Sequence, residues 1–405
     1  MIPRSFLMAW IALASLAPVL CGAEIRVGTD TATIAEAIDR AGPGDTIHLE
    51  PRVYYECAQF AGKYGNPGSP IVLDGHGATL DGSNPVDPAQ WREIEPGLFA
   101  TRDLLPVLHT AIIDRWFFLW NGRPNHMGRT AKGTKAPLKA PAELQPGEWT
   151  FLADEHPEAS SSRGISGEFL VKLPLGQTLA EARIAAPVRS AGVMLRGDNK
   201  HLVIRNLTAT HVYNDGFNIH GNCRDVVLEN IAAIECGDDG ISGHGTAEYR
   251  VAGLVSIGNS TGITDIGASR TNYDRVLIAE CLAYDLYFWE QGQHRLRNAI
   301  IISSAEKPFV VEGRDGKGCA VELDDVFLQR IGPPATARFS RPATVRATRL
   351  TLGNLGIEGD GDVTLTDCVI DGRPSAAGAL GADREALLQV IPQPPPGVVL
   401  RGHGR

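Results

Sequence analysis

A short pattern that recurs every 18 to 27 residues constrains the fold of this chain more than any other feature. The pattern is an apolar residue, any residue, usually Asn or Asp, and a second apolar residue. It occupies residues 204–207, 228–231, 251–254, 278–281, 296–299, 323–326, 347–350 and 365–368. Such a period is typical of a solenoid, in which each repeat packs only on its neighbours. A chain of 405 residues therefore need not divide into several globular domains.

The composition of each repeat indicates short parallel strands. Runs rich in β-branched residues, such as 251–257, are broken by Gly, Asn and Asp, and a 3.6-residue apolar spacing is absent from all but two short segments. In a coil of such strands, each rung buries its inward side chains on the rungs above and below. The Asn and Asp positions then stack at a tight turn, because these residues tolerate left-handed backbone geometry.

The segments outside the main repeat suggest a division of the chain into parts. The predicted parts are an N-terminal cap with the first rungs (24–84), an inserted β-rich domain (85–186), the main β-helix (187–372) and a C-terminal tail (373–405). A short amphipathic helix at 33–41 is expected to cover the open first rung. The tail is rich in Ala, Gly and Pro, so we expect one or two helical turns at 383–390 and then a loose end.

The first residues are typical of an export signal. Arg4 is the only charge, residues 6–20 form an apolar run, and small residues precede a predicted cleavage after Ala23. Removal of 1–23 predicts a secreted or periplasmic protein. No later stretch has about 18 uninterrupted apolar residues, so no transmembrane segment is expected.

Charge and cysteine content exclude two classes of function. The net charge of −9 comes without a block of Lys or Arg, which argues against nucleic-acid binding. Six cysteines follow the predicted signal, and none has the CxxC spacing of a cysteine zinc site. They are expected either to pair in an oxidising compartment or to fill space inside rungs.

Three strand segments align at a constant offset of 24 residues: 191–197, 215–221 and 239–245. Alternate strand residues share a face, and neighbouring strands lie about 4.8 Å apart. The inward residues are then Val193, Phe217, Ile241 and Ile263. The outward residues are Met194, Arg196, Asn218, His220, Ser242, His244, Trp289 and Gln291. Arg196, His220 and His244 should therefore form a polar ladder on the outer surface.

Asp215 and Asp239 form a second predicted ladder at the edge of this strip, with Asn214 and Asp238 beside them. Two carboxylates one rung apart suit glycoside cleavage, because one donates a proton while the other acts as nucleophile or base. Proximity of like charges raises one pKa and so supplies the acid. Alternatively, Asp215 and Asp239 are turn residues, since Asp-Gly is a common turn signal.

Other residues extend this candidate catalytic group. His220 and His244 are expected to orient hydroxyls or shuttle protons, or to be surface histidines in a stacked ladder. The candidate substrate-binding residues are Arg196, Asn214, Asn218, Trp289 and Gln291. Asp265 and Glu290 form a second candidate pair, although strict alternation points both side chains inward, where an unpaired charge is costly.

The repeats and strands resemble those of the pectin-lyase-like superfamily, which implies an all-β, right-handed, single-stranded parallel β-helix. The motifs around Asn214-Asp215-Gly216 and Gly237-Asp238-Asp239-Gly240 are similar to the carboxylate motifs of polygalacturonases. That resemblance implies acid and base roles for the three Asp residues. The sequence differs from polygalacturonases at 261–263, where Thr-Gly-Ile replaces Gly-His-Gly, and it has no Arg-Ile-Lys.

The insertion also resembles that of β-helix glycoside hydrolases of the β-xylosidase type, which interrupt the helix with a β-sandwich. A further similarity, of residues 215–221 to a motif of alginate epimerases and lyases, implies a different chemistry. There His220, His244 and Arg196 would act on a uronate, and Asp215, Asp238 and Asp239 would hold Ca²⁺.

These observations leave three alternatives. The first is a glycoside hydrolase that acts on a polysaccharide and requires no cofactor. The second is a lyase or epimerase that acts on a uronate polymer, with Ca²⁺ as a possible ligand. The third is a non-catalytic solenoid that binds glycans.

Overall fold

The computed structural model describes residues 22–398 except 103, 106–107, 133–135, 155–163 and 377. The predicted export signal lies, up to residue 21, outside the described residues. No helix in the described part is long and apolar enough to cross a membrane.

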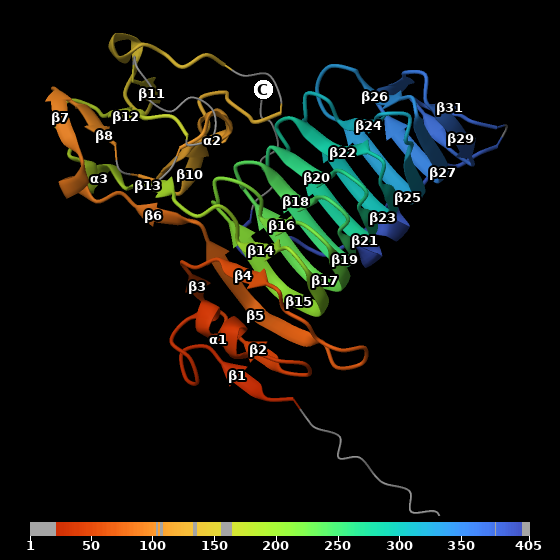
Figure 1. Cartoon of the computed structure of the whole chain (residues 1–405). Coiled ribbons are helices and arrows are strands. Elements are labelled where there is room, and N and C mark those ends of the chain that lie inside the picture. Colours follow the sequence, from red (N-terminus) through yellow and green to blue (C-terminus); the bar gives the residue numbers. More distant parts are fainter. Residues whose placement is uncertain are drawn as a thin grey trace, which may run out of the picture.

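The chain winds into a solenoid of two long sheets, which run side by side along its axis (Figure 1). The first sheet contains β1 (Glu24–Arg26), β2 (Thr46–His48), β3 (Val53–Tyr54), β5 (Ile71–Asp81), β15 (Asn199–Thr210), β17 (Cys223–Ile234), β19 (Glu248–Ile257), β21 (Arg270–Ala279), β23 (Gln293–Ser303), β25 (Cys319–Arg330), β27 (Ala343–Gly353), β29 (Asp362–Thr366), β30 (Val369–Ile370) and β31 (Arg373–Pro374). The second sheet contains β4 (Ala58–Ala61), β14 (Val193–Arg196), β16 (Phe217–Ile219), β18 (Asp239–Gly243), β20 (Thr261–Asp265), β22 (Tyr284–Glu290), β24 (Phe309–Gly313), β26 (Ala335–Ser340) and β28 (Leu355–Glu358). All pairings are parallel except that of β30 with β31. The predicted right-handed parallel β-helix is confirmed.

The register of the second sheet places inward residues of successive rungs directly on one another. Val193 pairs with Phe217, Phe217 with Ile241, and Ile241 with Ile263. All four side chains are fully buried in the core of the solenoid. Residues 215–221 therefore lie beside 239–245, as the 24-residue offset predicts, because a fixed repeat length keeps the strands in register.

A column of left-handed residues within the strands of the first sheet corrects one member of the sequence pattern. Asn206, Asn230 and Gly253 occupy successive rungs with positive φ, as predicted. On the next rung, however, the position belongs to Arg275, because Leu254 pairs with Val276. The assignment of 278–281 to this column was wrong. Its Glu280 also has a positive φ, but it follows the end of β21.

The N-terminal helix α1 (Ile34–Arg40) forms where the sequence predicts a cap. The Thr33 hydroxyl accepts a hydrogen bond from the Glu36 amide and so caps the helix. Ile34, Ala37 and Ile38 are buried in the core that continues into the rungs.

The insertion forms two four-stranded antiparallel sheets beside the early rungs (Figure 1). Its strands are β6 (Ser83–Pro85), β7 (Arg92–Glu95), β8 (Leu98–Thr101), β9 (Phe118–Trp120), β10 (Arg123–Asn125), β11 (Trp149–Ala153), β12 (Gly167–Lys172) and β13 (Ile184–Pro187), and its helices are α2 (Thr110–Arg115) and α3 (Leu179–Ala182). It has an aromatic core of its own, in which Trp116 stacks on Phe169 at a ring-centroid distance of 4.6 Å.

The C-terminal tail contains α4 (Arg384–Val390), capped by Asp383, where a short helix was expected. A loose end was expected beyond it, where Val398 is partly buried against the same cluster as Leu387. Leu387 and Ile391 are buried against an apolar strip on the outside of the first sheet, which includes Val255, Leu277 and Ile300. The described cysteines are all free, and five of the six are buried, which agrees with their interpretation as fillers.

Candidate active site

Three carboxylates lie together where β16 and β18 begin. Asp215 is two residues before β16, Asp239 is the first residue of β18, and Asp238 precedes it. One oxygen of each lies within 4.8 Å of one oxygen of the others. All three residues are less than 8% exposed, whereas the sequence alone suggested an open polar strip.

The insertion covers this group and supplies two cations to it. The Arg115 guanidinium, at the end of α2, donates to Asp238 Oδ2 over 2.7 Å. The Lys132 ammonium contacts Asp239 Oδ1, lies 3.4 Å from Asp238 Oδ1 and donates to the Thr264 hydroxyl over 3.1 Å. The preceding rung requires a glycine at 237, because a Cβ there would lie 2.6 Å from the Tyr213 carbonyl oxygen, and the same Cβ would lie 3.1 Å from the Arg115 carbonyl oxygen of α2.

Asp215 has no direct ion pair among the described residues, but three neutral donors hold it. The Asn218 amide and the Ser242 hydroxyl donate to its Oδ2 over 2.6 and 2.7 Å. The Asp239 backbone N–H donates to its Oδ1 over 3.2 Å. Asn218 and Ser242 belong to the row that was predicted to face outward, but both are buried.

The charges around the three carboxylates separate their pKa values. Burial, and then the charge of Asp238, raise the pKa of Asp215 and raise that of Asp239 well above its usual range. Burial also acts to raise the pKa of Asp238, but Lys132 and Arg115 outweigh it and lower that pKa. The three carboxylates carry three negative charges when all are ionised, whereas Arg115 and Lys132 carry two positive charges. The group is therefore neutral when the carboxylates together retain one proton. The group can therefore hold an acid and an ionised base at the same pH.

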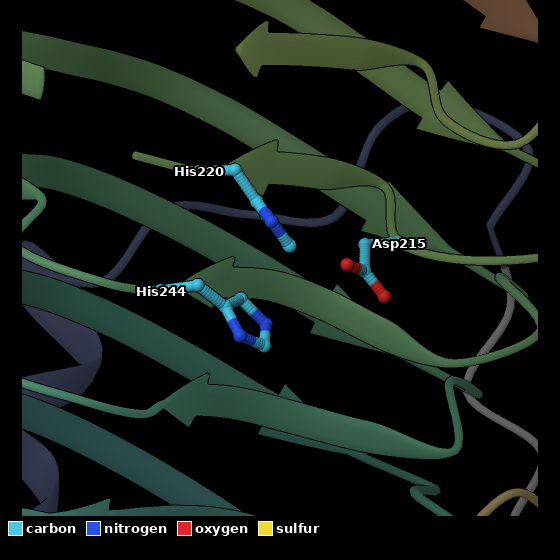
Figure 2. A group of neighbouring side chains, drawn as sticks. All are labelled: Asp215, His220 and His244. Carbon is cyan, nitrogen blue, oxygen red and sulfur yellow. The ribbon is translucent and has the colours of Figure 1, made fainter. Parts of the chain in front are cut away.

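His220 and His244 lie on neighbouring rungs with their rings stacked, at a centroid distance of 4.1 Å, and Asp215 lies at the start of the same rung as His220 (Figure 2). Burial lowers the pKa of both imidazoles, that of His220 to about 4. The rings are therefore neutral near pH 7. Arg196 lies one rung before His220 and is exposed.

An aromatic row continues the outer face on β22. In the register of the second sheet, Thr264 pairs with Tyr287, so this ring lies one rung from the Lys132 contact. Tyr287 stacks on Trp289 at 6.3 Å, and the Arg314 guanidinium lies 5.2 Å from the centre of the Trp289 ring. Trp289 and the neighbouring Gln291 are partly exposed, so both remain accessible to a ligand.

The second predicted pair is contradicted, because Asp265 and Glu290 lie in different environments. Asp265 is fully buried inside the solenoid and accepts hydrogen bonds from Tyr249, Tyr273 and Thr271. It pairs in register with Phe288, two residues before Glu290. Glu290 has φ 76°, which breaks strand alternation, and it binds Arg314 over 3.2 Å at the surface.

Two overlapping groups have the composition of a metal site. One is Asp215, Asp238 and Asp239, the group that the sequence suggested for Ca²⁺, and the other is Asp215, His220 and His244. Lys132 already binds two of the three carboxylates of the first group.

Arg115, Lys132 and Thr264 are site residues that were not predicted from the sequence. Thr264 was within reach, because it continues the outward row of Asn218 and Ser242. Arg115 and Lys132 could not be predicted in this way, because the insertion has no repeat that would place its side chains over a given rung.

No family model and no curated protein matches this chain. Among solved structures, it is similar to XylC in complex with xylose, at 12% identity and a TM-score of 0.50, over 84% of this chain and 70% of that chain. A second match is the Yersinia enterocolitica family 28 exopolygalacturonase, at 11% identity and a TM-score of 0.23, over 87% of this chain and 79% of that chain. The likeness to XylC concerns the fold alone, and it agrees with the predicted parallel β-helix.

Proposed function

We propose that this protein is a secreted glycoside hydrolase, with Asp215, Asp238 and Asp239 as its catalytic carboxylates. The observation that carries the proposal is the cluster of three buried carboxylates on adjacent rungs, which share two cations and have pKa values shifted in opposite directions. Glycoside cleavage needs one carboxylic acid and one carboxylate within reach of the same bond. A purely structural role would not require three such groups to share two cations.

In this proposal, Asp215 and Asp239 share the proton that is donated to the leaving oxygen. Asp238, kept ionised by Arg115 and Lys132, acts as nucleophile or as base for water. The Lys132 ammonium compensates the negative charge that builds up on the group as the proton leaves. Substrate reaches Asp215 from the side of His220 and His244, which orient its hydroxyls.

The partly exposed aromatic row supports a saccharide ligand. Tyr287 and Trp289 offer two ring faces one rung beyond the Lys132 contact, and sugar rings pack well on such faces. Arg196, Asn214 and Gln291 are the proposed polar contacts at the margins of the site.

A screen on neutral and uronate glycans, including β-xylosides and polygalacturonate, tests the function. Hydrolysis releases reducing ends without the near-ultraviolet absorbance of unsaturated ends, which a lyase would produce. Asp215→Asn and Asp239→Asn should each lower kcat about 10² to 10⁴-fold. Asp225→Asn, an exposed carboxylate on the first sheet, is the control and should leave turnover unchanged. Full turnover in both site variants would disprove the assignment of the catalytic carboxylates.

A further inference from the structure

We propose that Asp215, His220 and His244 form a binding site for a divalent transition-metal ion of the zinc type. Each residue offers one ligand atom, and the three atoms lie within 4.8 Å of one another. A tetrahedral zinc ion with bonds of about 2.1 Å holds its ligand atoms about 3.4 Å apart. Small side-chain rotations therefore suffice to close the site around an ion.

The two imidazoles are free to act as ligands. No hydrogen bond to either ring is found within the described part of the chain, and both stacked rings extend from their backbone toward the side on which Asp215 lies (Figure 2). Strand alternation fixes their positions, because each ring follows the strand of its own rung and the two strands are in register. A pair of histidines with unused nitrogen atoms on one rigid face is a starting geometry for metal binding.

The Asp215 carboxylate has a free acceptor position for a metal ion, and neighbouring side chains hold it in place. A carboxylate can accept about four hydrogen bonds or metal contacts, and Asp215 uses two on Oδ2 and one on Oδ1. The position left on Oδ1 can bind an ion. Asn218 and Ser242 meanwhile hold the carboxylate in place, as outer partners of metal ligands commonly do.

The ligand set selects zinc over calcium. Two imidazole nitrogens and one carboxylate suit Zn²⁺, Co²⁺ or Ni²⁺, whereas Ca²⁺ takes six to eight oxygen ligands. The oxygen-rich alternative of Asp215, Asp238 and Asp239 is already neutralised in part by Lys132. Calcium would have to displace that ammonium group, whereas zinc at the histidines would not.

A bound ion would also occupy Asp215. If the proposed hydrolase function holds, zinc therefore inhibits the enzyme by removing the carboxylate that shares the catalytic proton. This second consequence rests on the proposed function, whereas metal binding itself does not.

Calorimetric titration of the untagged full-length chain with ZnCl₂, and the visible spectrum with CoCl₂, test binding without any substrate. We expect one ion per chain. His220→Ala and His244→Ala should each weaken binding by about tenfold or more, with unchanged circular dichroism. His244→Asn provides a second, conservative variant should the alanine change lower stability.

The matched control is His76→Ala, at the other histidine pair of the molecule's described part. There His48 Nδ1 already contacts His76 Nε2 at 2.8 Å, and His48 Nε2 contacts Glu24. Those three nitrogen atoms are therefore in use. This variant should bind zinc as the unaltered chain does. Loss of binding in His76→Ala, retention in His220→Ala, tighter binding of CaCl₂ than of ZnCl₂, or no binding at millimolar metal would each overturn the site.

The two proposals fail separately. Zinc binding in a chain that cleaves no glycan would disprove the hydrolase while leaving the metal site intact. Glycan cleavage in a chain that binds no zinc would disprove the metal site alone.

Discussion

At the scale of single residues, the most consequential contact is that of one lysine with two buried carboxylates. Lys132 is 107 residues from Asp239 in the sequence, and it lies where three carboxylates would otherwise share only Arg115. A buried charge without a partner is costly, so the lysine compensates for the proximity of the acids. The same contact couples the fold of the insertion to the protonation of the site.

Lys132→Met should destabilise the protein by about 3 to 5 kcal/mol at neutral pH, because it leaves buried carboxylates with one cation. The loss should be smaller near pH 4. Without the ammonium group, the folded-state pKa values of Asp215 and Asp239 rise further above their unfolded values, so stability is retained at low pH and lost as pH rises. Urea denaturation at both pH values measures the difference.

The control for this change is Lys139→Met, at the ion pair of Lys139 with Glu148 on the surface of the insertion. Exposed pairs contribute at most about 1 kcal/mol, so this variant should unfold near the midpoint of the unaltered chain. Equal effects of the two substitutions would contradict the role assigned to Lys132.

One further buried acid, Asp285, allows a prediction that does not depend on the proposed function. Burial raises the pKa of Asp285 to about 7. Between about pH 4 and pH 7, the unfolded chain releases this proton while the folded chain keeps it, so stability falls as pH rises through that window. Asp285→Asn should flatten this part of the curve of melting temperature against pH. A curve as steep as that of the unaltered chain would contradict the raised pKa.

At the scale of elements, the C-terminal helix α4 covers an apolar strip that would otherwise face solvent. Leu387 is 4% exposed in the cluster with Leu277 and Ile300, whereas its neighbour Leu388 is 38% exposed. Apolar patches of this kind on a sheet promote association between molecules. The tail therefore acts as a cover for the outer face of the first sheet.

Leu387→Asp should detach α4, because it places a charge against the apolar strip, and the protein should then self-associate. Size-exclusion chromatography with light scattering detects this change. Leu388→Asp introduces the same charge on the same helix and should leave the protein unchanged in size. Similar behaviour of both variants would mean that α4 does not cover the strip.

At the scale of the whole molecule, the repeat explains what the sequence could and could not predict. A fixed rung length placed Val193 on Phe217 and His220 beside His244, because regular strands preserve alternation. The prediction was wrong at Glu290, where positive φ interrupts the strand. It could not find Lys132, because contacts between the insertion and the rungs depend on tertiary packing that no period encodes.

The insertion and the solenoid have separate cores, which makes their dependence on each other testable. The core of the solenoid contains no described residue between 81 and 192, and the insertion packs its own aromatic cluster. The two ends of the insertion meet, because the Val86 amide donates to the Ile184 carbonyl over 3.0 Å. A two-residue hairpin turn can therefore join them directly.

We expect a chain in which Asn-Gly replaces residues 87–183 to fold as a β-helix, with a strand-type circular dichroism spectrum and cooperative unfolding. It should have lost glycan cleavage, because Arg115 and Lys132 are gone and water reaches Asp215, Asp238 and Asp239. Failure to fold would show that the rungs need the insertion for stability. Retained cleavage in a folded chain would show that the two cations are dispensable, and the charge-sharing mechanism would have to be abandoned.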